Sequence, residues 1–326
     1  MRQHPAWVCV PPRMPGQGSP SCKDYRSQNM GTVRAIPTPA WARTAAFWAL
    51  AKPDVTLLVV LTTALGYCAG ARGPLDWLAL TKVVFGTLLL SAGTAALNQY
   101  VERALDGQMR RTASRPLPSG ILSPREALSF SSALVVCGLT YLFFLVNPFS
   151  ALLGACSAIT YLALYTPLKT RTPWCTFVGA FPGAVPPLIG WAAARNSLGA
   201  PAWMLFAILF VWQFPHFLSI AWVYREDYAR AGIRMLPVVD PSGRSTFRQI
   251  VGYSVVLVLA SLMPAISGLA GILYLFGALL LGLALLQVSL WTAREQTNRS
   301  AMWLMHSTVV HIPLLMALLV LDKVPR

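Results

Sequence analysis

The chain has 326 residues, of which 56% are hydrophobic and only 11% charged, and its formal net charge is +15. A soluble domain carries about 25% charged residues, so this composition excludes an ordinary soluble protein. Apolar runs long enough for a bilayer, which takes about 20 residues as a helix, indicate a polytopic membrane protein. The excess of Lys and Arg then marks membrane orientation, and we expect no nucleic-acid partner.

Residues 1–45 differ from the rest of the chain. They are rich in Pro, Gly and Arg, and Asp24 is their only acid. No apolar segment precedes a small-residue cleavage site, so a secretory signal peptide is not predicted. We interpret residues 1–45 as a disordered or targeting N-terminal extension, followed by one intramembrane domain over residues 46–322.

The apolar pattern of this domain predicts an all-α fold with nine transmembrane helices. Several connectors have turn chemistry, as in Gly73-Pro74 and Asn147-Pro148. The predicted spans are residues 55–72, 78–98, 127–146, 149–165, 175–194, 202–222, 250–268, 270–291 and 302–321.

Lys and Arg are divided unequally between the two ends of these spans. The side with the N-terminus and the connectors after the even-numbered spans holds 21 of the 26 basic residues. Because basic residues concentrate on the inner side, we predict a cytoplasmic N-terminus in a bacterial inner membrane. The mitochondrial inner membrane is the alternative. Both long connectors, about 99–126 and 223–249, lie on this basic side.

Three oxygen-bearing side chains end the second span at helical spacing. Asn98, Glu102 and Asp106 stand at i, i+4 and i+8, which places them on one face of a helix. Two carboxylates so close together beside a membrane need a compensating charge. Mg²⁺ is suited to this role, since it binds one or two carboxylates together with substrate phosphates. The alternative is an ordinary helix end in which Asp106 pairs with Arg110.

Basic residues on the same side of the membrane are candidates to hold a diphosphate. Arg111 and Arg115 follow the acids, and guanidinium groups match phosphate oxygens in pairs. Lys169 follows the fourth span, and Lys52 precedes the first. The alternative is that these charges only set the topology.

A second acidic cluster, Glu226 and Asp227, follows the sixth span on the same side. Two clusters on one membrane face could hold a single Mg²⁺–diphosphate between them. A solvated surface cluster is the alternative, and the pattern does not distinguish which of the two acids would meet the metal.

These segments resemble the UbiA superfamily of intramembrane prenyltransferases. Within the superfamily, the likeness over about residues 46–322 is to the branch that farnesylates protoheme IX. The chain departs from the superfamily pattern at Ala231, where an acid would follow Asp227 by four residues. The residues that match its three motifs are Asn98, Glu102, Asp106, Tyr165, Lys169, Glu226 and Asp227.

The resemblance implies a UbiA-type helical bundle with a central cavity, Mg²⁺ as cofactor, and farnesyl diphosphate and protoheme IX (heme B) as substrates. The diphosphate would ionise, a heme vinyl group would attack the allylic cation, and water would complete the hydroxyethylfarnesyl group of heme O. The implied catalytic residues are Asn98, Glu102, Asp106 and Asp227. The implied magnesium ligands are these four with Glu226. The implied diphosphate ligands are Lys52, Arg111, Arg115, Tyr165, Lys169 and Arg230.

His216, within the sixth span, is a candidate to orient the heme or to ligate its iron, and a structural histidine is the alternative. Tyr100, Phe214 or Trp222 would stabilise the allylic cation. Heme A synthase or oxidase-assembly proteins are candidate partners. Two other functions stay open: prenylation of an aromatic quinone precursor, and a non-enzymatic transporter, which would place charges at mid-bilayer depth.

Overall fold

The computed structural model describes residues 39–324, which are helical apart from turns and one isolated β-bridge between Ala270 and Lys323. The helices are α2 (Ala40–Leu50), α3 (Pro53–Gly70), α4 (Trp77–Asp106), α5 (Pro124–Leu145), α6 (Pro148–Ile159), the π-helix η1 (Thr160–Tyr165), α7 (Thr166–Leu168), α8 (Cys175–Ala184), α9 (Pro186–Arg195), α10 (Ala200–Val223), α11 (Arg225–Arg230), α12 (Leu236–Val239), α13 (Arg244–Ile266), α14 (Ile272–Glu295) and α15 (Asn298–Leu321).

The prediction of an all-α protein with nine transmembrane helices is confirmed for the described residues, which contain nine spans of sufficient length and hydropathy. One span joins α6, η1 and α7, and another joins α8 and α9. Large apolar side chains such as Phe144, Leu280 and Leu321 point outward and are 75%, 71% and 77% exposed. Such an apolar exterior is suited to contact with lipid.

Of the predicted extension over residues 1–45, residues 1–38 lie outside the described residues. Its last part forms α2, so helical structure begins at Ala40 rather than at residue 46. An ion pair between Arg43 and Glu126 ties α2 to the start of α5, and Leu50 at the end of α2 is fully buried.

Local sequence signals explain where the helices begin. The carboxylate of Asp76 accepts hydrogen bonds from the first amides of α4, at 2.9 and 3.0 Å. Ser123 and Glu126 form a capping box at the start of α5. The fifth span is interrupted between α8 and α9 because Pro186 and Pro187 cannot donate the amide hydrogen bonds that would continue α8.

Helix α4 is longer than predicted. It does not end at residue 98 but continues to Asp106, for 30 residues in total. A helix of this length extends about 45 Å, whereas the hydrocarbon core of a bilayer is about 30 Å thick. Its last turns therefore project to the membrane boundary and carry the predicted acids there.

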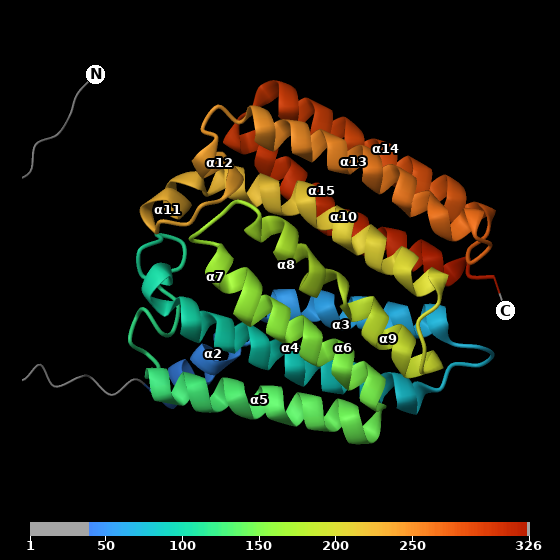
Figure 1. Ribbon diagram of the computed structural model, residues 1–326, viewed down its shortest axis with the longest axis horizontal. Helices are drawn as coiled ribbons and strands as arrows, with labels where there is room; N and C mark the ends of the chain where they lie inside the picture. The colour runs from blue at the N-terminus through green and yellow to red at the C-terminus, as the bar shows by residue number, and fades with distance from the viewer. Residues whose placement is uncertain (1–38, 325–326) are drawn as a thin grey trace, which may run out of the picture. The chain divides into compact units, whose positions relative to one another are not determined.

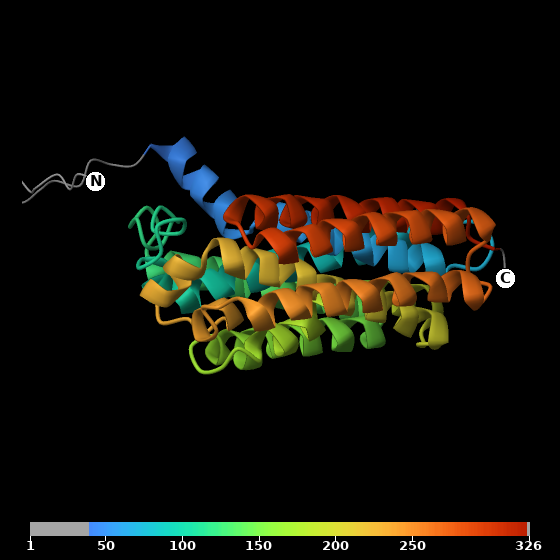
Figure 2. The same ribbon diagram turned by 90° about the horizontal axis from the view of Figure 1, so that it is seen from above.

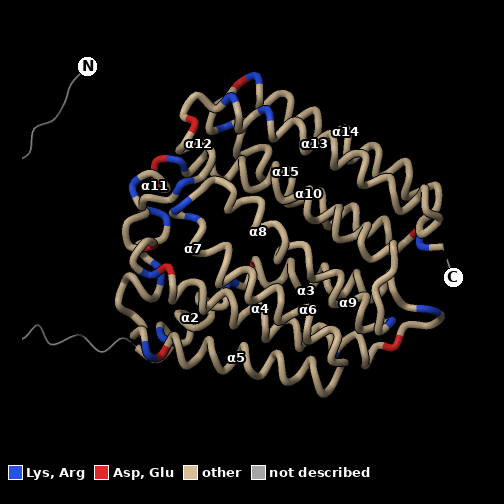
Figure 3. The backbone as a smooth tube through the Cα atoms, viewed as in Figure 1, with Lys and Arg blue, Asp and Glu red and all other residues tan. Residues whose placement is uncertain are grey.

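Figure 1 shows α4, α5 and α6 on one side of the bundle, α13 and α14 on the other, and α8 and α10 between them. The connector after α4 and the short helices α11 and α12 lie at the same end of the bundle, as the view from above also shows (Figure 2). Charged residues concentrate at this end, and a smaller group lies at the opposite end (Figure 3). The two long connectors thus share one face of the membrane domain.

Glycines let some neighbouring helices approach closely, as is common between membrane helices. A β-carbon at Gly190 of α9 would lie 1.9 Å from the carbonyl oxygen of Thr63 in α3. A β-carbon at Gly138 of α5 would lie 2.5 Å from the amide nitrogen of Leu90 in α4. These backbone contacts leave no room for a side chain.

We expect Gly190→Ala to destabilise the protein, because the added methyl group must push α3 and α9 apart. Overpacking of this kind costs about 1–3 kcal/mol. Thermal denaturation in detergent, followed by size-exclusion chromatography, measures the effect. Gly252→Ala is the matched control, since a β-carbon there meets no atom within 4 Å. Equal melting temperatures of the two variants would contradict the packing argument.

Candidate active site

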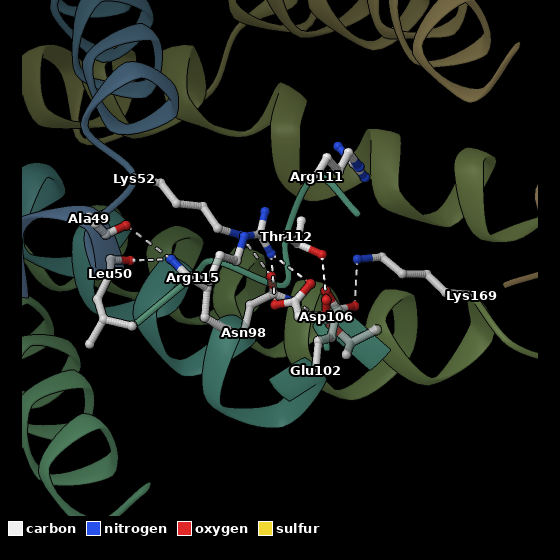
Figure 4. Close-up of polar contacts among 12 residues, drawn as sticks. Ala49, Leu50, Lys52, Asn98, Glu102, Asp106, Arg111, Thr112, Arg115 and Lys169 are labelled. Carbon is white, nitrogen blue, oxygen red and sulfur yellow. Dashed lines mark hydrogen bonds and ion pairs between the residues drawn. The ribbon is translucent and has the colours of Figure 1, made fainter. Parts of the chain in front are cut away.

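The inner end of α4 presents a row of buried oxygen-bearing side chains. Asn98, Glu102 and Asp106 are 1%, 7% and 1% exposed, and they follow one face of the helix (Figure 4). The three side chains lie on one face of α4, as their spacing predicts, because α4 remains helical through all three positions.

Each member of this row is hydrogen-bonded to a basic side chain from another part of the chain. Lys52 Nζ lies 2.9 Å from Asn98 Oδ1, and Lys169 Nζ lies 2.5 Å from Glu102 Oε1. Arg115 Nη1 lies 2.8 Å from both carboxylate oxygens of Asp106. Three basic groups thus converge on one helix face (Figure 4). Asp106 thus pairs with Arg115, and not with Arg110 as in the alternative interpretation.

The backbone holds Lys52 in place. Lys52 has a φ of 46°, in the left-handed region that non-glycine residues seldom adopt, and it separates α2 from α3. The side-chain amide of Gln99 donates to the carbonyl oxygens of Ala49 and Leu50, at 3.1 and 3.0 Å. Since Gln99 follows Asn98, one turn of α4 holds both Lys52 and the chain before it.

Thr166 fixes the orientation of the Asn98 amide. Its hydroxyl accepts a hydrogen bond from Asn98 Nδ2 at 3.2 Å and donates one to the carbonyl of Tyr161 at 2.9 Å. The amide oxygen of Asn98 is therefore the atom that faces Lys52. Neither Gln99 nor Thr166 is among the residues predicted for the site. The position of Gln99, a polar amide on a membrane helix, could have indicated a site residue, whereas nothing in the sequence distinguishes Thr166.

Burial and charge act differently on the two lysines, which lie just outside the spanning segments. Burial, followed by the charges of Arg115 and Lys169, lowers the pKa of Lys52 to about 7. Burial is the largest influence on Lys169 and lowers its pKa, but the charge and hydrogen bond of Glu102, together with Tyr161 and Tyr228, outweigh burial, so the pKa is raised above its ordinary value. Lys169 is therefore a permanent cation, held next to its carboxylate partner.

Asp227 and Glu226 have different environments. Asp227 is 8% exposed and accepts hydrogen bonds from the backbone N–H of Arg111 at 3.4 Å and from Arg230 Nη1 at 2.8 Å. Burial raises its pKa, but these donors and the Arg110 amide outweigh burial and lower it, which keeps the carboxylate ionised. Glu226 is exposed. The structure thus brings Asp227, rather than Glu226, to the connector that follows α4.

Arg111 ties the two connectors together. Its guanidinium carbon lies 4.7 Å from the ring centre of Tyr224 and 5.0 Å from that of Tyr228, and its Nη2 donates to the Tyr228 hydroxyl at 2.8 Å. These contacts hold α11 against the connector after α4. The two tyrosines are not among the predicted site residues.

The acids do not form a complete metal site by themselves. Among residues 39–324, no three His, Cys, Asp or Glu side chains gather closely enough to hold a metal ion. The buried groups of α4 and Asp227 are nevertheless hard oxygen donors. They fit a Mg²⁺ ion that takes its remaining ligands from phosphate oxygens and water.

A cavity of about 600 Å³ opens beside this cluster. Lys52, Tyr161 and Tyr165 line it, and it continues among apolar side chains to Val309 and Pro313 of α15. Tyr165 also packs against Lys169, whose Nζ lies 4.5 Å from its ring centre. An elongated apolar group attached to an anionic head would fit this arrangement, with its head among the basic groups.

The aromatic rings along the cavity differ from those predicted. Those that line it are Tyr161, Tyr165, Trp212 and Phe217. The predicted rings of Tyr100, Phe214 and Trp222 do not line it. Phe214 stacks on Tyr253 at 3.8 Å, and Trp222 packs against Phe247 at 4.7 Å.

His216 lines the same cavity. Its ring stacks on that of Trp212, with centres 5.0 Å apart and planes 12° apart, and its Nδ1 lies 2.8 Å from Thr308 Oγ1. Nδ1 therefore makes the hydrogen bond that is expected of a structural histidine. The ring also hydrogen-bonds the backbone carbonyl of Met305.

Comparison with known proteins gives a consistent result. The model of the UbiA prenyltransferase family matches residues 59–312. The protoheme IX farnesyltransferase of Solibacter usitatus is 50% identical over 283 residues, covering 84% of this chain and 97% of that protein. The protoheme IX farnesyltransferase of Koribacter versatilis is 44% identical over 300 residues, covering 89% and 97%.

Solved structures share the fold. A digeranylgeranylglyceryl phosphate synthase superposes with a TM-score of 0.72 at 18% identity, covering 86% of this chain and 98% of that one. A UbiA homolog from Archaeoglobus fulgidus, bound to GPP and Mg²⁺, superposes with a TM-score of 0.61 at 15% identity, covering 84% and 99%. At this level of identity the likeness concerns the fold alone.

Proposed function

This chain belongs to the UbiA prenyltransferase family, and we propose that it transfers the farnesyl group of farnesyl diphosphate to a vinyl group of heme B. The product is heme O. One structural observation carries the proposal: a buried row of oxygen donors is bonded to basic groups, one of which, Lys52, lines a mostly apolar cavity. The named relatives, 50% and 44% identical over nearly their whole length, support heme B as the acceptor.

The metal assignment follows from burial and donor chemistry. Asn98, Glu102, Asp106 and Asp227 would hold Mg²⁺ together with the diphosphate oxygens. When bound, the ion neutralises charge on the leaving diphosphate. Glu226, predicted as a further ligand, is left out because it is exposed.

The basic residues exchange partners when substrate binds. In the structure Lys169 and Arg115 neutralise Glu102 and Asp106, at 2.5 and 2.8 Å. Once these carboxylates face a metal, the same lysine and arginine are free to donate to phosphate oxygens. Lys52, Arg111 and Arg230 are the other donors within this cluster. Their hydrogen bonds strengthen as negative charge collects on the departing oxygens, which lowers the barrier to ionisation.

The cavity protects the allylic cation that remains. Its apolar walls exclude bulk water from the farnesyl chain. The rings of Tyr161 and Tyr165, tilted with their centres 5.4 Å apart, lie at the end nearest the basic cluster, where cation–π attraction would stabilise the charge. The terminal carbon of the heme vinyl group then forms the new carbon–carbon bond.

Topology supports a membrane enzyme whose chemistry occurs at the inner face. With 21 of 26 basic residues on the site's side, we assign that side and the N-terminus to the cytoplasm of a bacterial cell. Heme O leaves within the membrane, where heme A synthase or an oxidase-assembly protein would receive it. No charged residue that we assign to the site lies at mid-bilayer depth, which disfavours a transporter.

Membranes containing the full chain should convert heme B and farnesyl diphosphate to heme O, detected by mass spectrometry. Chelation with EDTA should abolish the product and added Mg²⁺ should restore it, because the carboxylates alone do not complete a site. An aromatic quinone precursor, offered in place of heme, should remain unmodified. Prenylation of that precursor instead of heme would reject the proposed acceptor.

The neighbouring acids of α11 provide a matched pair of variants. Asp227→Asn should lower turnover by about 100-fold or more, the loss typical when a group that stabilises transition-state charge is removed. Glu226→Gln should retain nearly full turnover, because Glu226 is exposed. Initial rates of heme O formation test this, with size-exclusion profiles confirming that both variants fold. The opposite order of activities would assign the metal to Glu226.

A further inference from the structure

Completion of heme O requires a step that the diphosphate site does not perform. After the vinyl group bonds to the farnesyl carbon, positive charge rests on the vinyl carbon attached to the porphyrin. Water must add its oxygen there and lose one proton. The balance is heme B, farnesyl diphosphate and water giving heme O, diphosphate and a proton. The inference below rests on the proposed function and concerns where this proton goes.

The hydrogen bonds around His216 define which ring nitrogen carries hydrogen. Thr308 Oγ1 donates its only hydrogen to the carbonyl oxygen of Met305, at 2.6 Å. The same hydroxyl lies 2.8 Å from His216 Nδ1, so in that contact Nδ1–H must be the donor. A neutral imidazole protonated at Nδ1 carries an unshared electron pair at Nε2.

Trp212 holds the imidazole in this orientation. It stacks on His216, and its indole N–H donates to the Thr308 carbonyl oxygen at 2.8 Å. One residue of α15 therefore fixes both rings. Because Nδ1 is bonded to Thr308, Nε2 is the nitrogen left for the cavity that His216 lines.

Gln213 supplies a second acceptor on the same face of α10, three residues before His216. Its Nε2 donates to the carbonyl oxygens of Ala180 and Leu209, at 2.9 and 3.1 Å, so Oε1 is the end without a partner among the described residues. Gly183 provides the space for this oxygen, since a β-carbon there would lie 2.0 Å away. Gln213 lines the same cavity.

The depth of this pair suits the reacting carbon. At about 1.5 Å per residue, His216 lies about 10 Å inside the inner end of α10 at Val223. Asn98 lies about 12 Å inside the inner end of α4 at Asp106. Lys52, which is bonded to Asn98, lines the same cavity as His216 and Gln213, so the two acceptors share this cavity with the innermost end of the diphosphate site.

We infer that His216 is the general base for water addition and that Gln213 orients the water. The water donates one hydrogen to His216 Nε2 and the other to Gln213 Oε1, which leaves an oxygen lone pair directed at the cation. As the new carbon–oxygen bond forms, the proton passes to Nε2. Iron ligation would use Nε2 but would leave the second acceptor without a role.

The experiment uses the purified full-length protein with heme B, farnesyl diphosphate and Mg²⁺ in ¹⁸O-labelled water. Mass spectrometry separates labelled heme O from a farnesylated heme lighter by one water, which forms when the cation loses a carbon-bound proton instead. In His216→Phe the stacked ring is retained and the base is lost. The ratio of hydroxylated to water-free product should fall about 100-fold, within the range of general-base contributions.

Two further variants separate this role from packing and from iron ligation. Thr308→Val removes the acceptor for Nδ1–H and should lower the product ratio by a smaller factor without removing the imidazole. His306→Phe, at an exposed histidine on the same helix, should leave the ratio unchanged. The absorption spectrum of bound heme should be the same in wild type and His216→Phe.

The outcomes are distinct. A wild-type product ratio in His216→Phe overturns the inference and leaves the proposed function intact, with the leaving diphosphate as the base. A changed heme spectrum with an unchanged product ratio overturns it in favour of iron ligation. If the wild-type protein yields no farnesylated heme of either mass, the proposed function itself fails.

Discussion

Carboxylates at the edge of a membrane must be neutralised, and the inner end of α4 meets this requirement with ion pairs. Glu102 and Asp106 are almost fully buried, so each would be costly without an opposite charge close by. Lys169 and Arg115 supply these charges from separate connectors. The geometry of the inner face follows from this need, because each pair draws one connector onto the end of α4.

The same pairs hold the side chains of the site in place. Under the proposed function, the carboxylates would hold a metal ion while the lysine and arginine would hold the phosphate oxygens, so the ion and the diphosphate together would replace the internal pairing. Arg230 and the backbone amide of Arg111 hold the Asp227 carboxylate by hydrogen bonds in the same way. Lys169 and Arg115 already lie next to these carboxylates, so movements of side chains alone would exchange the partners.

The sequence was sufficient for the features that depend on composition and periodicity. Hydropathy gave nine spans, and the spacing of Asn98, Glu102 and Asp106 gave a single face, because both follow from helix geometry. Features that depend on tertiary contacts were not accessible. The left-handed Lys52 and the hydroxyl of Thr166 have no local signature. The choice between Glu226 and Asp227 depends on which side of a single helical turn faces the neighbouring connector, and the rings of the cavity depend on how α10 is rotated.

The π-helix at residues 160–165 has a consequence for how this span is constrained. A wide turn corresponds to one extra residue within an α-helix, and each residue of an α-helix turns the chain by about 100°. Relative to a continuous α-helix with the same number of residues, the wide turn therefore shifts the rotational position of the residues that follow it by about 100°. Thr166 and Lys169 follow this turn and bond Asn98 and Glu102. The direction in which these two side chains leave the span thus depends on the wide turn.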